Sequence, residues 1–269
     1  RPEFALLLPM AEIGHKPWRK VCTYQFPEGR LGSPRYMDVP AHEGPLVSII
    51  IPTPGRDKHL RRCVNSIYSH TTTPFEVIII DNGSEDGTFK FLEQEQWRGN
   101  FHGVRLNANV GFQKATNFGM DRAKGKYLLL FNDDAWVESL MPDGRDWLRT
   151  LIDALEADPS LGLVGPHEGD SPALGGKVLY FWCVMMRRTL YEQVGPLDDV
   201  LFFNYGGDDD YCERVRRAGH GVKVVPGFEG RLRHFMNLVP EKQKNEELEK
   251  SRAALRGKYP ELVREPVTA

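Results

Sequence analysis

The chain has 269 residues, and its 35 Lys and Arg residues stand against 37 Asp and Glu residues, for a formal net charge of −2. This balance argues against a general nucleic-acid binder, because neutralising phosphates requires a basic surface. Hydrophobic residues make up 41% of the chain and charged residues 27%, which excludes a disordered or fibrous protein. The longest apolar runs, such as 127–131, are far too short to span a bilayer, so we expect no transmembrane segment.

The four cysteines are scattered and show no paired spacing of the kind that holds a metal. They indicate reduced thiols, so we expect a cytoplasmic protein, and a peripheral position at a membrane stays an open alternative. The charged tail favours neither oligomerisation nor membrane contact, which leaves the oligomeric state open as well.

Prolines punctuate the first 44 residues, and because proline fixes φ and removes a donor, this pattern predicts an irregular arm. Strands and helices then alternate along the chain. The predicted strands are 47–52, 75–80, 103–106, 126–131, 181–187 and 222–225. The predicted helices are one that carries Leu60, Cys63, Val64 and Ile67 on one apolar face, followed by 88–96, 111–123, 147–157, 208–218 and 241–258. Apart from its helix, the stretch 135–180 is predicted to form Gly- and Pro-rich loops.

This alternation is typical of βαβ units on a largely parallel sheet, so the predicted fold class is α/β. We divide the chain into an extension (1–44), a catalytic domain (45–238) and a helical tail (239–269). In such sheets ligands bind beyond the carboxyl ends of the strands. The chemistry should therefore lie in the loops that follow the strands at residues 51, 80 and 131.

Asp81 follows one of these strands and opens a turn with Asn-Gly and Asp-Gly pairs. Such pairs are ordinary turn chemistry, and Ser84 or Thr88 could simply cap the next helix. A carboxylate at the end of a buried strand is also placed to accept a hydrogen bond from a base or a ribose hydroxyl. The residues alone leave both interpretations of Asp81 open.

Asn132, Asp133 and Asp134 follow the next of these strands. Two carboxylates and an amide form a cluster of hard oxygen ligands, which suits Mg²⁺ or Mn²⁺ bridged to a diphosphate. A turn with a helix cap would use one acid and would leave the cluster unexplained. We therefore predict a metal site here.

A third acidic cluster, Asp208 to Asp210, follows two glycines and opens a predicted helix. One of the acids would cap the helix, but three exceed what capping needs. The glycines allow a close backbone approach, which favours a substrate cleft. His234 lies further on, and a lone histidine is usually a surface or core residue rather than a ligand.

Taken in order, these segments resemble the family 2 glycosyltransferases, which have the GT-A fold, and a rhamnosyltransferase-like subgroup is left open. The resemblance is carried by the segments 47–53, 80–88, 107–119, 130–134, which stands in place of the DXD motif, and 202–219. It implies an inverting, hexosyltransferase-like and metal-dependent enzyme that moves a sugar from a nucleoside-diphosphate sugar to an acceptor hydroxyl. UDP or dTDP is the favoured nucleotide, and surface-polysaccharide or glycoconjugate synthesis would be a suitable setting.

The resemblance also implies roles for individual residues. Asp208 would be the catalytic base, and Asp134 and His234 would hold Mn²⁺ or Mg²⁺. The nucleotide-sugar site would comprise Pro52, Thr53, Arg56, Asp81, Asn82, Asn117 and Asp133. The acceptor site would comprise Trp182, Tyr205, Gly207 and Asp209.

Two departures from the family pattern affect these roles. Asn132 stands where the DXD motif has its first acid, which removes one charge from the metal site. Gly207 stands where the family usually has Glu, which removes a hydrogen-bonding group on the acceptor side. Asp209 and Asp210 are the candidates to compensate for that loss.

Three alternative functions fit the sequence less well. A catalytically silent nucleotide-sugar binding domain would explain both departures as lost chemistry. A nucleotidyltransferase would carry a Gly-rich phosphate loop after the first strand, and residues 52–56 form a poor version of one. A dinucleotide oxidoreductase is disfavoured because no G-x-G-x-x-G follows an early strand.

Overall fold

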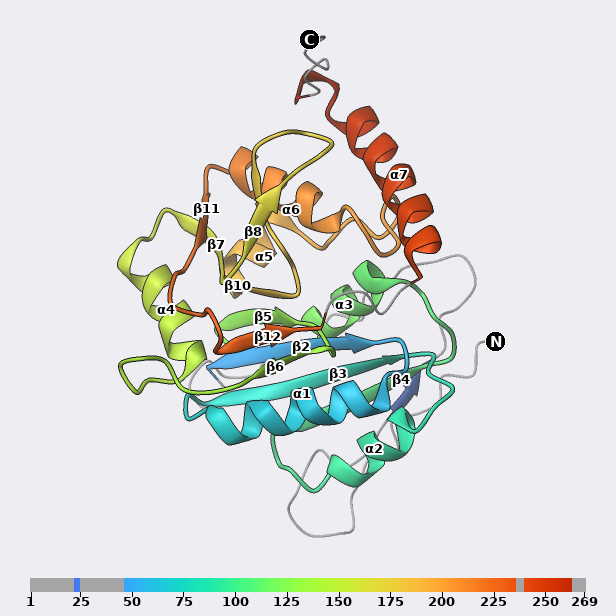
Figure 1. Ribbon diagram of the computed structural model, residues 1–269, viewed down its shortest axis with the longest axis vertical. Helices are drawn as coiled ribbons and strands as arrows, with labels where there is room; N and C mark the ends of the chain where they lie inside the picture. Colours follow the sequence, from blue (N-terminus) through green and yellow to red (C-terminus); the bar gives the residue numbers. More distant parts are fainter. Residues whose placement is uncertain (1–21, 25–45, 236–239, 263–269) are drawn as a thin grey trace.

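The computed structural model describes residues 22–24, 46–235 and 240–262, and Figure 1 shows its arrangement. Within these residues the core is built on an eight-stranded sheet. Its strands lie in the order β1 (Cys22–Tyr24), β4 (Phe101–Leu106), β3 (Phe75–Asn82), β2 (Val47–Thr53), β5 (Tyr127–Phe131), β10 (Cys183–Arg187), β7 (Leu161–Gly165) and β11 (Gly221–Val224).

Most neighbouring strands of this sheet are parallel. The pairs β1–β4, β4–β3, β3–β2, β2–β5 and β7–β11 are all parallel, whereas β10 is antiparallel to both of its neighbours, β5 and β7. Strands β2, β3 and β5 are buried along almost their whole length, as expected for strands covered on both faces. The predicted α/β class with a largely parallel sheet is therefore confirmed.

Helices cover both faces of the sheet (Figure 1). Ile49 and Ile51 of β2 pack in one apolar cluster with α1, α2 and α4, while Ile50 packs in a second cluster with α3, α5 and α6. The alternation follows from the two-residue period of a strand. The helices are α1 (Asp57–His70), α2 (Thr88–Glu95), α3 (Phe112–Met120), α4 (Trp147–Ala157), α5 (Arg188–Val194), α6 (Gly207–Arg217) and α7 (Glu241–Lys258), with a short 3₁₀ turn at Pro260–Leu262.

The prediction of loops for the rest of residues 135–180 is wrong, because this stretch contains β6 (Ala135–Val137), β7, β8 (Glu168–Asp170) and β9 (Lys177–Leu179). The glycines of β7 have a packing role rather than a turn role. A Cβ on Gly162 would lie 2.7 Å from Cγ1 of Val215 in α6, so only glycine lets the helix pack this closely. The prediction also omitted α5 and β12 (Leu232–His234).

The N-terminal extension is described only at β1, which pairs with β4 at the edge of the sheet. This strand lies inside the stretch that its prolines predict to be irregular, so that prediction is wrong for these three residues. The other residues of the predicted arm before Leu46 lie outside the described part of the chain. The division of the chain into three parts stays a prediction.

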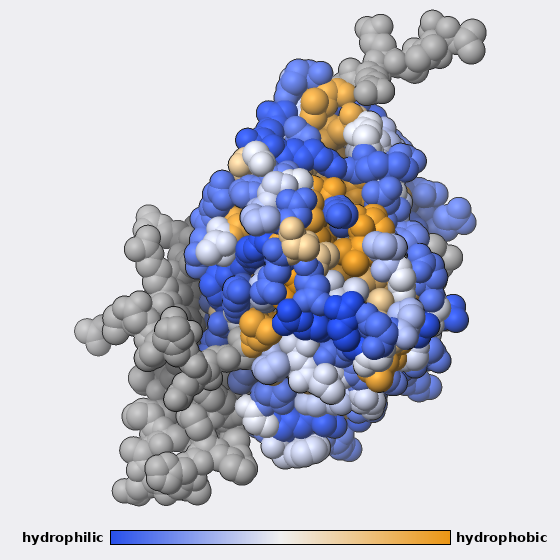
Figure 2. Space-filling model, turned by 90° about the vertical axis from the view of Figure 1, so that its left-hand side faces the viewer, coloured by the Kyte–Doolittle hydropathy of each residue, from blue (hydrophilic) through white to orange (hydrophobic). Residues whose placement is uncertain are grey.

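The molecular surface is mostly polar on the face shown in Figure 2, where apolar residues gather in a few patches between hydrophilic ones. Three of the most exposed large apolar side chains are close in sequence, namely Val200, Leu201 and Phe203, with exposed fractions of 84%, 47% and 51%. Among the described helices, none combines the length and the apolar character that crossing a membrane requires.

Candidate active site

The predicted site residues come together because of the direction of the strands. Strands β2, β3 and β5 are parallel, so their carboxyl ends lie at the same edge of the sheet, and Thr53 pairs in register with Asp81. Strand β10 is antiparallel, so its first residue, Cys183, pairs with the last residue of β5, Phe131. The acidic cluster after β5 and Trp182 before β10 therefore meet, and the backbone N–H of Asn132 donates to the carbonyl of Trp182 at 2.9 Å.

Asp133 is held by the last residue of β2, Thr53, and by Arg56 in the loop that follows this strand. The hydroxyl of Thr53 donates to its Oδ2 at 2.6 Å, and the guanidinium of Arg56 donates to its Oδ1 at 2.9 Å. Burial raises the pKa of Asp133 to about 6, although Arg56 and Thr53 favour the charged form. Both oxygens of Asp133 are thus engaged inside the protein.

Asp134 is also buried, but its Oδ1 makes no hydrogen bond. This oxygen lies 3.1 Å from Nε2 of His234, and the side-chain amide of Asn132 lies 3.3 Å from the same nitrogen. The pairing of β12 with β6 sets His234 opposite Ala135, directly beside Asp134. The Oδ1 of Asn132 is likewise buried without a hydrogen bond.

Trp182 lies against this group rather than apart from it. Its indole ring stacks on the imidazole of His234, with a centroid distance of 5.0 Å and an interplanar angle of 6°. The stacking limits the rotation of the imidazole, so Trp182 is placed to orient His234. Its predicted contact with the acceptor stays a prediction.

Asp81 is fully buried at the end of β3. Its Oδ1 accepts from the backbone N–H of Ser84 at 2.8 Å, while its Oδ2 makes no hydrogen bond. Nε of Arg105 lies 3.7 Å from that Oδ2. Burial raises the pKa of Asp81, because the ionised form is less well solvated there. Arg105 is a neighbour of the predicted base-recognition residue that the sequence did not reveal.

The two predicted asparagines hold the backbone in place. Asn82 donates to the carbonyl of Gly111 and accepts from the backbone N–H of Val110. Asn117 exchanges two hydrogen bonds of 2.9 Å with the backbone of Leu197. Both ends of each carboxamide are engaged, which favours a structural role for these residues over nucleotide binding.

The predicted acceptor side begins at α6. Gly206 precedes this helix with φ of 86°, a backbone conformation that favours glycine, and the helix starts at Gly207. Asp208 accepts a hydrogen bond from the backbone N–H of Asp209 at 3.1 Å. Burial, followed by the charge of Asp209, raises the pKa of Asp208 to about 7. Asp208 is thus a carboxyl group that titrates near neutral pH.

The hydroxyl of Tyr205 is influenced by charged groups from two other segments of the chain. Burial raises its pKa, the charge of Glu247 in α7 raises it further, and the charge of Arg56 lowers it. Arg56, whose charge acts on Tyr205, also binds Asp133.

Comparison with known proteins assigns this arrangement to a family. The sequence model of glycosyl transferase family 2 matches residues 48–195, which is more than half of the chain. The chain belongs to glycosyltransferase family 2. It carries the domain that the order of its motifs predicts, and the predicted resemblance is confirmed.

Curated relatives support this family. Glycosyltransferase AglE of Haloferax volcanii is 25% identical over 198 residues, which are 66% of this chain and 64% of that protein. Glycosyltransferase EpsJ of Bacillus subtilis is 31% identical over 213 residues, which are 67% of this chain and 60% of that protein. The chain spans 24%, 64% and 37% of the length of three matched relatives, so it corresponds to only part of each.

Solved structures support the fold. The mannosyltransferase PcManGT from Pyrobaculum calidifontis, in complex with GDP-Man and Mn²⁺, has a TM-score of 0.60 and 17% identity, over 84% of this chain and 67% of that chain. At this level of identity the similarity shows the fold alone. The predicted GT-A fold is therefore confirmed.

Gln113 is a residue of this family 2 domain that sequence reasoning missed. A Cβ on Gly207 would lie 2.6 Å from its Nε2 and 2.7 Å from its Cδ. The side chain of Gln113 is 2% exposed, and its Oε1 makes no hydrogen bond. Gln113 therefore occupies the space beside Gly207, where family 2 enzymes usually carry Glu.

Gly207→Glu is expected to lower the free energy of unfolding by about 1–3 kcal/mol, because the new side chain overlaps the buried Gln113. Gln113→Ala would create room, so the double variant should recover part of the loss. Denaturant unfolding of the wild type, both single variants and the double variant measures this coupling. Additive effects of the two substitutions would contradict the proposed overlap.

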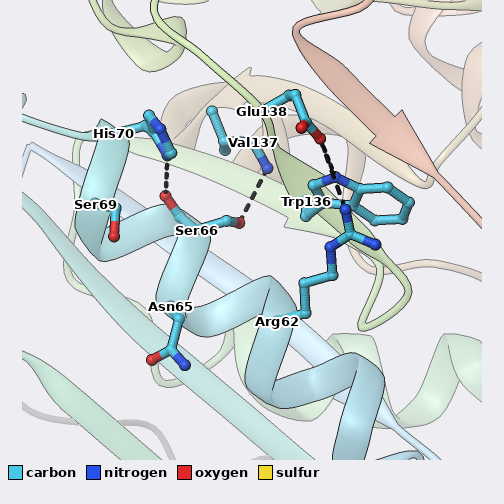
Figure 3. Close-up of a pocket in the computed structure, with 8 residues that line it drawn as sticks. All are labelled: Arg62, Asn65, Ser66, Ser69, His70, Trp136, Val137 and Glu138. Atoms are coloured by element: carbon cyan, nitrogen blue, oxygen red, sulfur yellow. Dashed lines mark hydrogen bonds and ion pairs between the residues drawn. The ribbon is translucent and has the colours of Figure 1, made fainter.

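A surface groove along α1 is lined by none of these residues (Figure 3). Its polar groups bond to one another: the hydroxyl of Ser66 accepts from the N–H of Val137, and the indole of Trp136 donates to Glu138 at 2.6 Å. The guanidinium of Arg62 covers the ring of Trp136 at 3.5 Å. The residues at the edge of the sheet therefore remain the candidate site of this family 2 domain. The groove is lined by Arg62, Asn65, Ser66, Ser69, His70, Trp136, Val137 and Glu138.

Proposed function

We propose that the protein is an inverting, metal-dependent glycosyltransferase that moves a sugar from a nucleoside-diphosphate sugar to an acceptor hydroxyl. The observation that carries this proposal is that two adjacent acids differ in their hydrogen bonding. Asp133 is bound by Thr53 and Arg56, whereas Asp134 keeps a buried oxygen without a hydrogen bond beside His234. Burying an oxygen without a hydrogen bond costs free energy unless a bound ligand supplies the missing partner.

The donor set of this site fits a divalent cation. Among the described residues, no three His, Cys, Asp or Glu side chains form a metal-binding group. Asp134 and His234 form a pair, and Asn132 adds a buried amide oxygen without a hydrogen bond. Neighbouring ligands in an octahedral shell with bonds of about 2.1 Å lie about 3 Å apart, which agrees with the 3.1 Å between Asp134 and His234.

Asp134 and His234 would hold Mn²⁺ or Mg²⁺, with Asn132 in place of the first acid of the DXD motif. A bound cation supplies positive charge that neutralises the departing diphosphate. Arg56 adds a fixed positive charge at the same place, because it contacts both Asp133 and Asp134. The bound Mn²⁺ of the solved mannosyltransferase supports this proposal.

Asp208 would act as the general base. It takes the proton from the acceptor hydroxyl while that oxygen bonds to the anomeric carbon, and the bond from this carbon to the diphosphate oxygen breaks. Attack from the face opposite the leaving group inverts the anomeric configuration in a single displacement. The raised pKa of Asp208 supports this role, because a base with a pKa near the working pH is the more effective one.

The surroundings of Asp81 favour UDP or dTDP as the donor nucleotide. The Oδ2 of Asp81 is a single available acceptor, and Arg105 beside it is a donor. Uracil and thymine present one N–H flanked by carbonyl oxygens, which matches this pair, whereas guanine presents two adjacent donors. A base that binds Asp81 would also contact Arg105, because the two side chains lie 3.7 Å apart.

The proposal is tested with purified full chain, Mn²⁺ and a panel of UDP-, dTDP- and GDP-sugars, with aryl glycosides as hydroxyl acceptors. The release of nucleoside diphosphate measures turnover, and the NMR coupling of the anomeric proton in the product reports inversion. We expect a uracil or thymine donor to react only when metal is present. Metal-dependent nucleotide binding without turnover on any acceptor would instead favour a silent binding domain, and absence of binding would refute the donor site.

The rate of sugar transfer is expected to fall by about tenfold per pH unit below about pH 7, because Asp208 must lose its proton to act as a base. The charge of Asp209 contributes to the raised pKa of Asp208. Asp209→Asn should therefore lower this pKa and move the acidic limb of the pH–rate profile to lower pH. Initial rates from about pH 5.5 to 8.5, with nucleotide affinity measured over the same range, check this prediction. A rate that is independent of pH over this range would contradict it.

A further inference from the structure

Helix α7 lies against the acceptor side of the site, although the family match ends at residue 195. Figure 1 shows the helix at the outer edge of the molecule, beside α6. Glu247 accepts a hydrogen bond from the side chain of Asn204 at 2.8 Å. One turn further along, a Cβ on Gly206 would lie 3.0 Å from Cβ of Ser251. Leu255 then packs in an apolar cluster with Phe202.

The end of the helix makes the strongest contacts. The ammonium of Lys258 lies 2.7 Å from Oδ2 of Asp198 and 2.6 Å from Oδ1 of Asp210. The hydroxyl of Tyr259 donates to the same Oδ1 of Asp210 at 2.6 Å. Asp210 is fully buried, so these partners compensate a charge that would otherwise be costly. They also leave it unsuited to replace Asp208 as the base.

Asp198 and Asp210 stand at the two ends of one segment. Asp198 accepts from the backbone N–H groups of Val200 and Leu201, so its carboxylate organises the start of the segment. Asp210 lies in the first turn of α6, two residues after Asp208. A single ammonium group therefore ties together both ends of the stretch that carries the proposed base.

We propose that Lys258 is a positioning residue that closes the 198–210 segment and thereby fixes Asp208 and Tyr205 for the acceptor. The catalytic consequence of this inference rests on the proposed function. The closure of the segment by Lys258 does not depend on it. In this proposal helix α7 holds the acceptor side of the site in its active geometry. The charges of its exposed face do not reveal this role, because the residues responsible lie on its buried side and at its end.

The test compares three variants of the full chain. Lys258→Met removes the ammonium group but keeps the length of the side chain, and Lys258→Arg keeps the charge. Lys250→Met is the matched control, because this lysine lies on the exposed face of the same helix. Amide hydrogen exchange over 199–209 reports closure of the segment, initial rates with the aryl glycoside panel report transfer, and calorimetry with UDP and Mn²⁺ reports donor binding.

In Lys258→Met we expect exchange over 199–209 to become about tenfold faster and kcat to fall by about tenfold or more. Donor KM and UDP affinity should change by less than about twofold, because the donor residues are untouched. Lys258→Arg should restore most of the rate, and Lys250→Met should match the wild type. If Lys258→Met does not fold, Tyr259→Phe, which removes only the hydrogen bond to Asp210, should give the same pattern to a smaller degree.

Unchanged exchange and unchanged kcat in Lys258→Met would overturn the inference. A parallel loss of UDP binding and transfer would also overturn it, because that pattern indicates general unfolding rather than positioning. If the wild type transfers no sugar, the proposed function fails, but the exchange measurement still decides whether Lys258 closes the segment.

Discussion

Asp208→Asn is expected to lower kcat for sugar transfer by about 10³-fold or more while UDP affinity in Mn²⁺ stays within about twofold of the wild type. The amide keeps the shape of the side chain but cannot accept the proton of the acceptor hydroxyl. The proposed donor site uses other residues, at the ends of β2, β3 and β5, so donor binding should persist. Nucleoside diphosphate release and calorimetric titration measure the two quantities on the same preparation.

The stability of this variant supplies an internal control. Burial and the charge of Asp209 raise the pKa of Asp208 to about 7 in the folded chain, against about 3.9 in an unfolded one. Between these values the folded state binds the proton more tightly, so ionisation of Asp208 lowers stability as the pH rises from about 4 to about 7. Asp208→Asn removes this cost, and its Tm should exceed that of the wild type at about pH 8 and approach it at about pH 4. Lost activity in a more stable protein would exclude misfolding as the cause.

The variant Asp209→Asn distinguishes the role of Asp209 from that of Asp208. We expect it to retain a large part of its turnover, since the proposed base remains. If Asp208→Asn keeps most of its activity while Asp209→Asn loses it, the base is Asp209, and the assignment made here is wrong.

Asp134→Ala is expected to abolish the metal dependence of nucleotide binding. With both carboxylate oxygens gone, His234 and Asn132 remain as neutral ligands, and the Kd for UDP in Mn²⁺ should rise by about 100-fold, to the value measured without metal. Turnover should fall at least as far, because the diphosphate would leave without the charge of the cation and with only Arg56 to compensate it. Titration of UDP with and without Mn²⁺ checks the first effect.

A matched control for this substitution is Asp153→Ala on α4, whose carboxylate pairs with Arg145 and Arg149 near the surface. It removes a carboxylate of the same size and should leave nucleotide binding unchanged. Unaltered Mn²⁺-dependent binding in Asp134→Ala would contradict the metal site and move the search for ligands to other residues.

The sequence allowed the strands of the sheet centre to be predicted because their burial leaves a clear pattern. Strands β2, β3 and β5 are nearly uninterrupted apolar runs, and their predicted bounds lie within two residues of those observed. Strand β7 escaped prediction because Gly162 and Gly165 resemble a turn, although their small size serves packing against neighbouring elements. Strand β1 was not predicted either, because the surrounding prolines indicate irregular structure.

The candidate site was predictable in part for a similar reason. The rule that parallel strands end at a common edge groups Thr53, Asp81 and the acids after β5 from the sequence alone. No pattern of that kind connects Lys258 with Asp198, which lies 60 residues earlier in the chain. Gln113 was equally hidden, because a single polar residue on a helix shows no periodicity that would indicate its neighbour.

The reversal of β10 has a consequence for how such a protein could be re-engineered. Because β10 enters the sheet edge where β5 leaves it, the second half of the chain reaches this edge without passing through the strands that carry the proposed donor residues. The connections at 166–181 and 199–206 can therefore change in length or composition while the ends of β2, β3 and β5 stay in place, provided that Trp182 and Asp198 are kept. Under the proposed function, exchange of these two connections alone is expected to change the acceptor preference while the proposed donor residues stay unchanged.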